Sequence, residues 1–157
     1  MTLLPLVLLL SLPQDGPFSD PFADALARAK SGNRRVLIVW GRNDSAESVR
    51  LHALLAKDPA LKKKLLYEYD VVYTSQLDLA KKHGADVSEL PALTILAADG
   101  TVLSTEKVPA LDDKKALLAL LEKHQAKPWV AKDLYDAALK QAKDSKKRLF
   151  LHFGAPW

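Results

Sequence analysis

The sequence predicts an α/β domain in which helices flank a central mixed sheet of about four strands. Two continuous apolar runs of strand length, 36–40 and 71–74, are typical of strands buried on both faces of a sheet. Residues 92–96 and 102–105 give a third and a fourth strand pattern, joined by the tight turn Ala98-Asp99-Gly100, which predicts a hairpin. Helical patterns separate the other strands, as expected for an α/β domain.

The first two helices are predicted from their apolar spacing and their ends. Residues 20–31 carry apolar side chains at helical spacing, and Ser31-Gly32-Asn33 ends the pattern. The next helix runs over 45–56. Asp44 is its expected N-cap, and Glu47, three residues on, is the expected capping-box partner.

The later helices have equally local signals. Asp58-Pro59 opens a further helical piece through Leu66, because proline is favoured in the first turn of a helix. A short helix over 76–83 ends at Gly84, and a helix over 112–125 carries four leucines at core spacing. The predicted order after the first helix is therefore strand, helices, strand, helix, hairpin and helix.

Composition excludes several classes of function. The 157 residues are 48% hydrophobic and 27% charged, which fits globular material, and there is no cysteine. Disulfides, thiolate metal sites and cysteine nucleophiles are therefore excluded for this chain. The formal net charge is +4, but the basic residues are scattered among acids and no aromatic stacking motif accompanies them. We expect no nucleic-acid partner.

The amino-terminal apolar run predicts export. Residues 3–12 are too short to span a bilayer as a helix but have the length of a secretory h-region. We expect residues 1–14 to be a signal peptide, the mature protein to be periplasmic or secreted, and the mature chain to have no membrane span. A buried amino-terminal segment is the alternative interpretation.

The end of the chain repeats its beginning. When the sequence is shifted by 113 residues, Ala25, Ala29, Arg35 and Gly41 fall on identical residues, and the apolar positions between them agree. Residues 131–157 are therefore predicted to be a helix–strand fragment, the truncated start of a second copy of the domain. Chance agreement over about twenty residues is the alternative.

The order of elements, Trp40-Gly41 after the first buried strand, and Leu90-Pro91 before the hairpin together resemble the thioredoxin-like superfamily. The resemblance covers residues 20–126 as one domain. Phe153-Gly154-Ala155-Pro156-Trp157 is similar to the strand end that in thioredoxins leads into Trp-Cys-x-x-Cys. The resemblance thus extends to residues 131–157 as the start of a second domain.

Mapped onto this sequence, the family's active cysteine pair falls on Ser45 and Ser48, with Asp44 and Glu47 beside them. Thiol–disulfide exchange needs a thiolate stabilised at a helix N-terminus, and a serine hydroxyl neither ionises usefully there nor forms a reversible bridge. The resemblance therefore implies a degenerate, redox-inactive site.

The resemblance assigns further positions around this site. Val39 occupies the place of the family's buried acid, and His152 is its equivalent in the second copy, where it could relay a proton or simply pack in a strand. Trp40, Leu90 and Pro91 fall where the family has its substrate groove, and Pro91 matches the family's cis-proline. That groove holds extended polypeptide in working oxidoreductases.

Two other chemistries, hydrolysis and metal binding, have weaker support in the sequence. Ser45, Ser48 and His52 share a helix face, but no acid is placed to orient His52 and no oxyanion donors are identifiable, which argues against hydrolysis. His83 and His124 lie near helix ends without ligand spacing. We expect no metal site and no cofactor.

The favoured hypothesis is an exported, redox-inactive thioredoxin-like domain that binds an extended polypeptide or serves as a scaffold for a protein partner. The alternative is the amino-terminal part of a tandem thiol–disulfide oxidoreductase whose catalytic motif follows Trp157. Three explanations of the chain end at Trp157 are then open: a selenocysteine codon read as a stop, a contig end, or a genuine stop codon. The nucleotides after codon 157 distinguish them.

Overall fold

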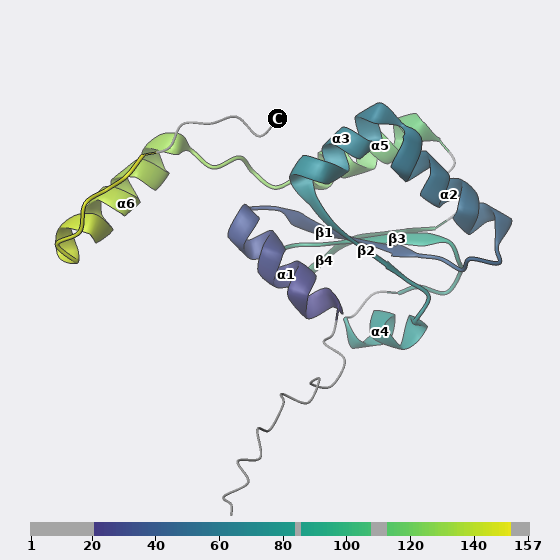
Figure 1. Cartoon of the computed structure of the whole chain (residues 1–157). Helices are drawn as coiled ribbons and strands as arrows, with labels where there is room; N and C mark the ends of the chain where they lie inside the picture. Colours follow the sequence, from purple (N-terminus) through teal and green to yellow (C-terminus); the bar gives the residue numbers. More distant parts are fainter. Residues whose placement is uncertain (1–20, 84–85, 108–112, 152–157) are drawn as a thin grey trace, which may run out of the picture.

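The computed structural model describes residues 21–83, 86–107 and 113–151, and it confirms the predicted mixed sheet of four strands. The strand order is β2-β1-β3-β4 (Figure 1). β1 pairs in parallel with β2 and antiparallel with β3, and β3 and β4 form the predicted hairpin. The strands are β1 (Arg35–Trp40), β2 (Tyr69–Thr74), β3 (Ala92–Leu96) and β4 (Val102–Lys107).

Helices cover both faces of the sheet, so the domain has three layers (Figure 1). One face carries α1 and α4, and the opposite face carries α2, α3 and α5. A sixth helix, α6, follows the domain in the chain. The helices are α1 (Pro21–Gly32), α2 (Ala46–Lys57), α3 (Pro59–Glu68), α4 (Leu77–Lys82), α5 (Lys114–His124) and α6 (Ala131–Asp144).

The central strand β1 divides the core into two clusters. Successive side chains of a strand point to opposite faces, so Leu37 and Val39 pack under α2, α3 and α5, whereas Val36, Ile38 and Trp40 pack against α1. All five are fully buried. This explains why the run reads as continuously apolar rather than alternating.

The second predicted strand differs from expectation. Residues 71–74 were expected to be buried on both faces, but β2 lies at the edge of the sheet and the Tyr73 side chain is half exposed. The strand also begins earlier, at Tyr69. An apolar run cannot reveal whether a strand has one neighbour or two, because strand order is set by tertiary pairing.

The carboxyl-terminal fragment forms only in part. Helix α6 is present as expected, but Leu149, Phe150 and Leu151 are not in a strand. A strand needs a neighbour for its backbone N–H and C=O groups, and none of the described strands pairs with these residues. His152 and the rest of the tail lie outside the described residues.

The predicted signal peptide, residues 1–14, also lies outside the described residues. Among the helices that the structure does describe, none has both the length and the apolar character needed to cross a membrane.

Candidate functional site at the amino end of α2

Three segments of the chain meet where β1 ends. The Gly41 backbone N–H donates a hydrogen bond of 3.0 Å to the Thr74 carbonyl oxygen, which joins the loop after β1 to the end of β2. On the other side, Trp40 pairs with Ala92, so Leu90 and Pro91 lie at the same sheet edge. The Leu90–Pro91 peptide bond is cis, as the resemblance implied. The loop of residues 41–45 then leads into α2.

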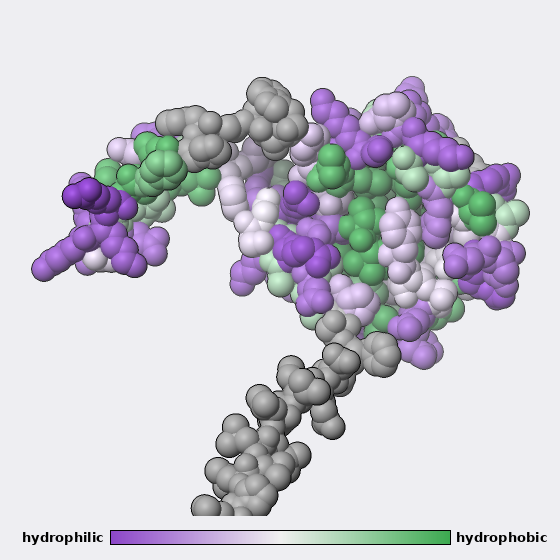
Figure 2. All heavy atoms as spheres, in the orientation of Figure 1, coloured by the Kyte–Doolittle hydropathy of each residue, from purple (hydrophilic) through white to green (hydrophobic). Residues whose placement is uncertain are grey.

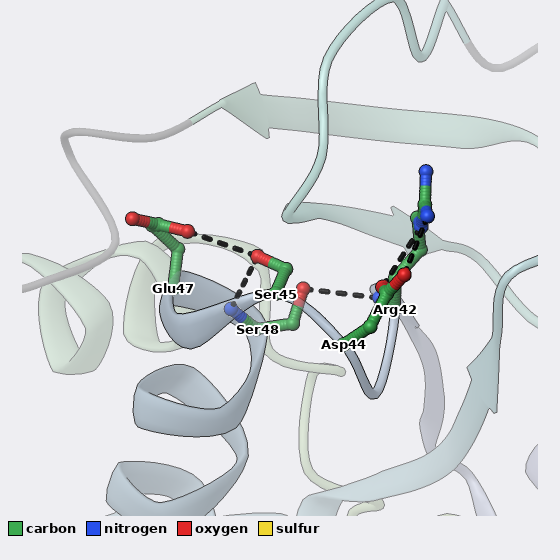
Figure 3. Close-up of polar contacts among 5 residues, drawn as sticks. All are labelled: Arg42, Asp44, Ser45, Glu47 and Ser48. Carbon is green, nitrogen blue, oxygen red and sulfur yellow. Dashed lines mark hydrogen bonds and ion pairs between the residues drawn. The ribbon is translucent and has the colours of Figure 1, made fainter.

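Ser45 and Ser48 form the start of α2 (Figure 3). Ser45 is the N-cap: its Oγ accepts a hydrogen bond of 3.3 Å from the Ser48 backbone N–H. Ser48 is fully buried, and its own Oγ accepts a hydrogen bond of 3.0 Å from the Arg42 backbone N–H. The two hydroxyls therefore hold the loop and the first helical turn together.

The structure corrects the predicted cap. Asp44 was expected to cap α2, but Ser45 does so, and Asp44 instead pairs with Arg42, with Nη2 and Oδ2 2.6 Å apart. With Asp44 as the cap the helix would begin at Ser45, but it begins at Ala46. Serine is as good a capping residue as aspartate. The hydrogen bond from Arg42 holds the pKa of the Asp44 carboxyl below its usual value.

Glu47 lies in the first turn of α2, but not as a capping-box partner of Asp44. Its Oε2 accepts a hydrogen bond of 3.0 Å from the Ser45 hydroxyl (Figure 3). Two hydrogen bonds lower the pKa of the Glu47 carboxyl: the one from its own backbone N–H has the larger effect, and the one from the Ser45 hydroxyl comes next. A negative charge in the first turn also suits the positive end of the helix dipole. Glu47 therefore supports the helix start.

These contacts define what the site can do chemically. Ser45 and Ser48, the positions to which the resemblance assigns the active pair, carry hydroxyls instead of thiols, and both hydroxyls are already engaged in hydrogen bonds. Val39, which the resemblance places where a buried acid is expected, is fully buried in an apolar cluster. The residues described around the start of α2 include no cysteine, so they offer no attacking thiolate.

The predicted groove residues are part of the core. Trp40 was expected to line a groove, but it is fully buried, and its Nε1–H donates a hydrogen bond of 2.9 Å to the Thr94 Oγ1. The last residue of β1 faces α1, away from α2, because side chains alternate along the strand. Pro91 is buried as well, and Leu90 is partly buried against the cluster that contains Trp40.

The site includes a cavity that sequence reasoning missed. It has a volume of about 240 Å³ and is lined by Gly41, Asn43, His52, Tyr73, Thr74 and Ser75. The His52 and Tyr73 rings meet edge to face, with centroids 4.8 Å apart. His52 Nε2 is buried and has no hydrogen-bond partner among the described residues, and partial burial raises the pKa of the Tyr73 hydroxyl.

One signal could have revealed this cavity. The carboxyl ends of parallel strands meet at one edge of a sheet, so residues after β1 and at the end of β2 are expected to adjoin. In the sequence, His52 is notable only for sharing a helix face with Ser45 and Ser48, a combination that does not support hydrolysis. Within the described ranges, no three His, Asp or Glu side chains gather as a metal site would require.

Comparison with known proteins identifies the fold. No family model and no curated protein matches the sequence. Among solved structures, a disulphide isomerase from Xylella fastidiosa Temecula1 is similar, with 22% identity and a TM-score of 0.57, over 73% of this chain and 97% of that chain.

A thioredoxin from Thermus thermophilus is also similar, with 16% identity and a TM-score of 0.52, over 66% of this chain and 82% of that chain. Both matches have TM-scores above 0.5, so this chain, with the mixed four-stranded sheet flanked by helices that was predicted from the sequence, shares their overall fold. The protein therefore has the thioredoxin-like fold, in a chain without cysteine.

Proposed function

We propose that residues 20–126 are an exported, redox-inactive thioredoxin-like module that binds extended polypeptide. The observation that carries the proposal is the engagement of Ser45 and Ser48 in the start of α2, where the fold's oxidoreductases would need free sulfur. Because the fold alone does not fix a function, we assign binding on the surface that remains around this site.

The surface around the start of α2 supports a polypeptide ligand. The Arg42 and Asp44 side chains are 61% and 66% exposed, and Glu47 is half exposed beside them. The cavity that His52 and Tyr73 help to line opens next to this loop and is mostly polar in its lining. Charged groups and polar cavities suit the N–H and C=O groups of an extended chain, which needs hydrogen bonds along its length.

The loss of redox function is tested by restoring sulfur. We expect the unmodified protein to show no disulfide reduction of insulin with dithiothreitol above background. The double variant Ser45→Cys and Ser48→Cys should gain measurable activity, because its first thiol lies at a helix N-terminus. The matched control, Ser31→Cys and Ser104→Cys, should gain none. Activity in the unmodified protein would refute the assignment.

Binding is tested with a defined probe. Reduced, carboxymethylated lactalbumin is unfolded and carries no reactive thiol, so it reports binding alone. We expect its addition to shift the amide NMR signals of Arg42, Asn43 and Thr74, and Arg42→Ala to weaken binding at least threefold. Lys132→Ala, on α6, is the control and should leave binding unchanged. Saturating probe without any shift would contradict the proposal.

Export is part of the proposal and has its own test. We expect residues 1–14 to be removed when the full chain is expressed in a bacterial host, and the product to be found in the periplasm. Intact-mass measurement of the periplasmic and cytosolic fractions would show this. A full-length product confined to the cytosol would contradict export while leaving the binding proposal untouched.

A second candidate function is a tandem thiol–disulfide oxidoreductase of which this chain is the amino-terminal part. The observation that favours it is the similarity in fold to a disulphide isomerase, 97% of whose chain is covered. The nucleotide sequence after codon 157 tests it. An open frame that encodes a Cys-x-x-Cys or selenocysteine motif would support it, and its absence would remove it.

A further inference from the structure

Helices α1 and α6 end in the same unusual way. Asn33 and Lys146 both have a φ of 53°, and they are the only non-glycine residues with positive φ among those described. Positive φ is uncommon outside glycine, and lysine is not a residue that favours it. After each, the next backbone N–H donates a hydrogen bond of 2.8 Å: from Arg34 to the Ala29 carbonyl, and from Lys147 to the Ala142 carbonyl. Each residue lies 113 positions from its counterpart.

The two helices also have matching apolar faces in different surroundings. In α1, Phe22, Ala25 and Ala29 are fully buried. Their counterparts in α6 are Tyr135, Ala138 and Ala142, and no residue of α6 is buried. Tyr135 is 42% exposed and its neighbour Leu134 is 46% exposed, and Figure 2 shows apolar residues at the surface of α6. The face that α1 uses for packing is present in α6 without a cover.

The packing of α1 shows what such a face fits. Its buried residues lie against Val36, Ile38 and Trp40, the alternate side chains of the strand that follows it. In the repeat, Val36 and Ile38 correspond to Leu149 and Leu151. Leu151 is 48% exposed and is not in a strand, so the helix and the segment after it both lack a sheet.

We propose that α6 is the first helix of a second thioredoxin-like unit, and that its apolar face is a docking surface for the central sheet of that unit. Residues 148–151 would begin the central strand of that sheet, as residues 35–38 begin β1 in the first unit. The occupant is thus a β-sheet face lined with aliphatic side chains, placed as the first sheet is placed under α1. This proposal does not depend on the proposed binding function.

A helix exchange in the full chain tests the proposal. Residues 21–33 and 134–146 are exchanged, so that the chain keeps its length and the α6 sequence must pack on the known sheet. We expect one cooperative thermal transition with near-native circular dichroism, and a midpoint lowered by less than about 10 °C. Some loss is expected because α6 has Gln141 where Arg28 forms an ion pair of 2.7 Å with Asp70.

A register-shifted exchange is the matched control. Residues 132–144 take the place of 21–33, which turns the apolar face by about 200° because each helical residue turns by about 100°. This variant should lose the cooperative transition. A second matched exchange that carries Gln141→Arg restores the partner of Asp70. If neither matched version unfolds cooperatively, or if the shifted version does so equally well, the proposal is overturned.

A membrane is the rival occupant of an exposed amphipathic helix. Co-sedimentation of the full chain with vesicles of phosphatidylcholine and phosphatidylglycerol would reveal it. We expect no co-sedimentation above that of the Leu139→Asp variant. Vesicle binding that this substitution abolishes would assign the face to lipid and overturn the proposal.

Discussion

The hydroxyl of Ser48 fills the space that a side chain at position 41 would need. A Cβ atom built on Gly41 would lie 3.1 Å from the Ser48 Oγ and 3.2 Å from its Cβ, closer than such atoms ordinarily approach. Because Ser48 is fully buried and its Oγ also accepts from the Arg42 N–H, it has little freedom to move away. The loop and the helix are therefore fitted to each other at this one contact.

Gly41→Ala is expected to lower the free energy of unfolding by about 1 to 3 kcal/mol, the usual cost of overpacking a filled site. Urea unfolding followed by circular dichroism measures it. Gly32→Ala is the control, because the nearest atoms there, at 3.4 Å or more, belong to the flexible Arg34 side chain. Equal effects of the two substitutions would contradict the packing argument.

Ser48→Ala should destabilise the protein by about 1 kcal/mol, because the Arg42 N–H loses its acceptor. The same unfolding measurement tests this, and amide hydrogen exchange at Arg42 should become faster. Ser31→Ala, which removes an exposed hydroxyl bonded to the Arg28 carbonyl, serves as the comparison and should change stability by less than about 0.5 kcal/mol. Unchanged exchange at Arg42 would show that another group takes over as acceptor.

Thr94→Val is expected to cost about 1 to 3 kcal/mol, since it leaves the buried Trp40 Nε1–H without its acceptor. The shape of the side chain is nearly conserved, so the loss reports the hydrogen bond rather than a cavity. Thermal unfolding gives the cost. Thr105→Val removes a hydroxyl that contacts Thr94 but not Trp40, and its effect should be smaller.

Stability should fall with acid through Asp58. This carboxylate caps α3 and pairs with Lys114 of α5 at 2.7 Å, and the hydrogen bond from Lys114 is the main reason that its pKa is lowered from 3.8. A lowered folded-state pKa means that the stabilisation is present above about pH 4 and is lost as the pH falls through the folded value.

Asp58→Asn keeps a good N-cap but removes the charge. The stability difference between the unmodified protein and this variant should therefore shrink between pH 5 and about pH 2. Urea titrations at several pH values measure it. Lys114→Met should reduce the same pH dependence. If the stability difference between the unmodified protein and Asp58→Asn does not vary with pH, Asp58 is not the source of the loss of stability in acid.

Local signals in the sequence sufficed for most of the fold. The apolar run 36–40 identified the central strand, and Ala98-Asp99-Gly100 identified the hairpin, because turn chemistry and side-chain periodicity depend on neighbours in the chain. The same locality explains the error at the start of α2, where Asp44 and Ser45 are equally suitable caps and the choice depends on how the loop packs.

The sequence by itself determined that the chain has no thiol chemistry, since the absence of cysteine needs no structure to interpret. It also determined the order of helices and strands, which follows from patterns along the chain. Only the tertiary structure decided that Trp40 is a core residue, that Tyr73 is exposed at a sheet edge, and that His52 and Tyr73 help to line a cavity beside Gly41. Strand order and facing direction arise from contacts between distant segments, which no local pattern encodes.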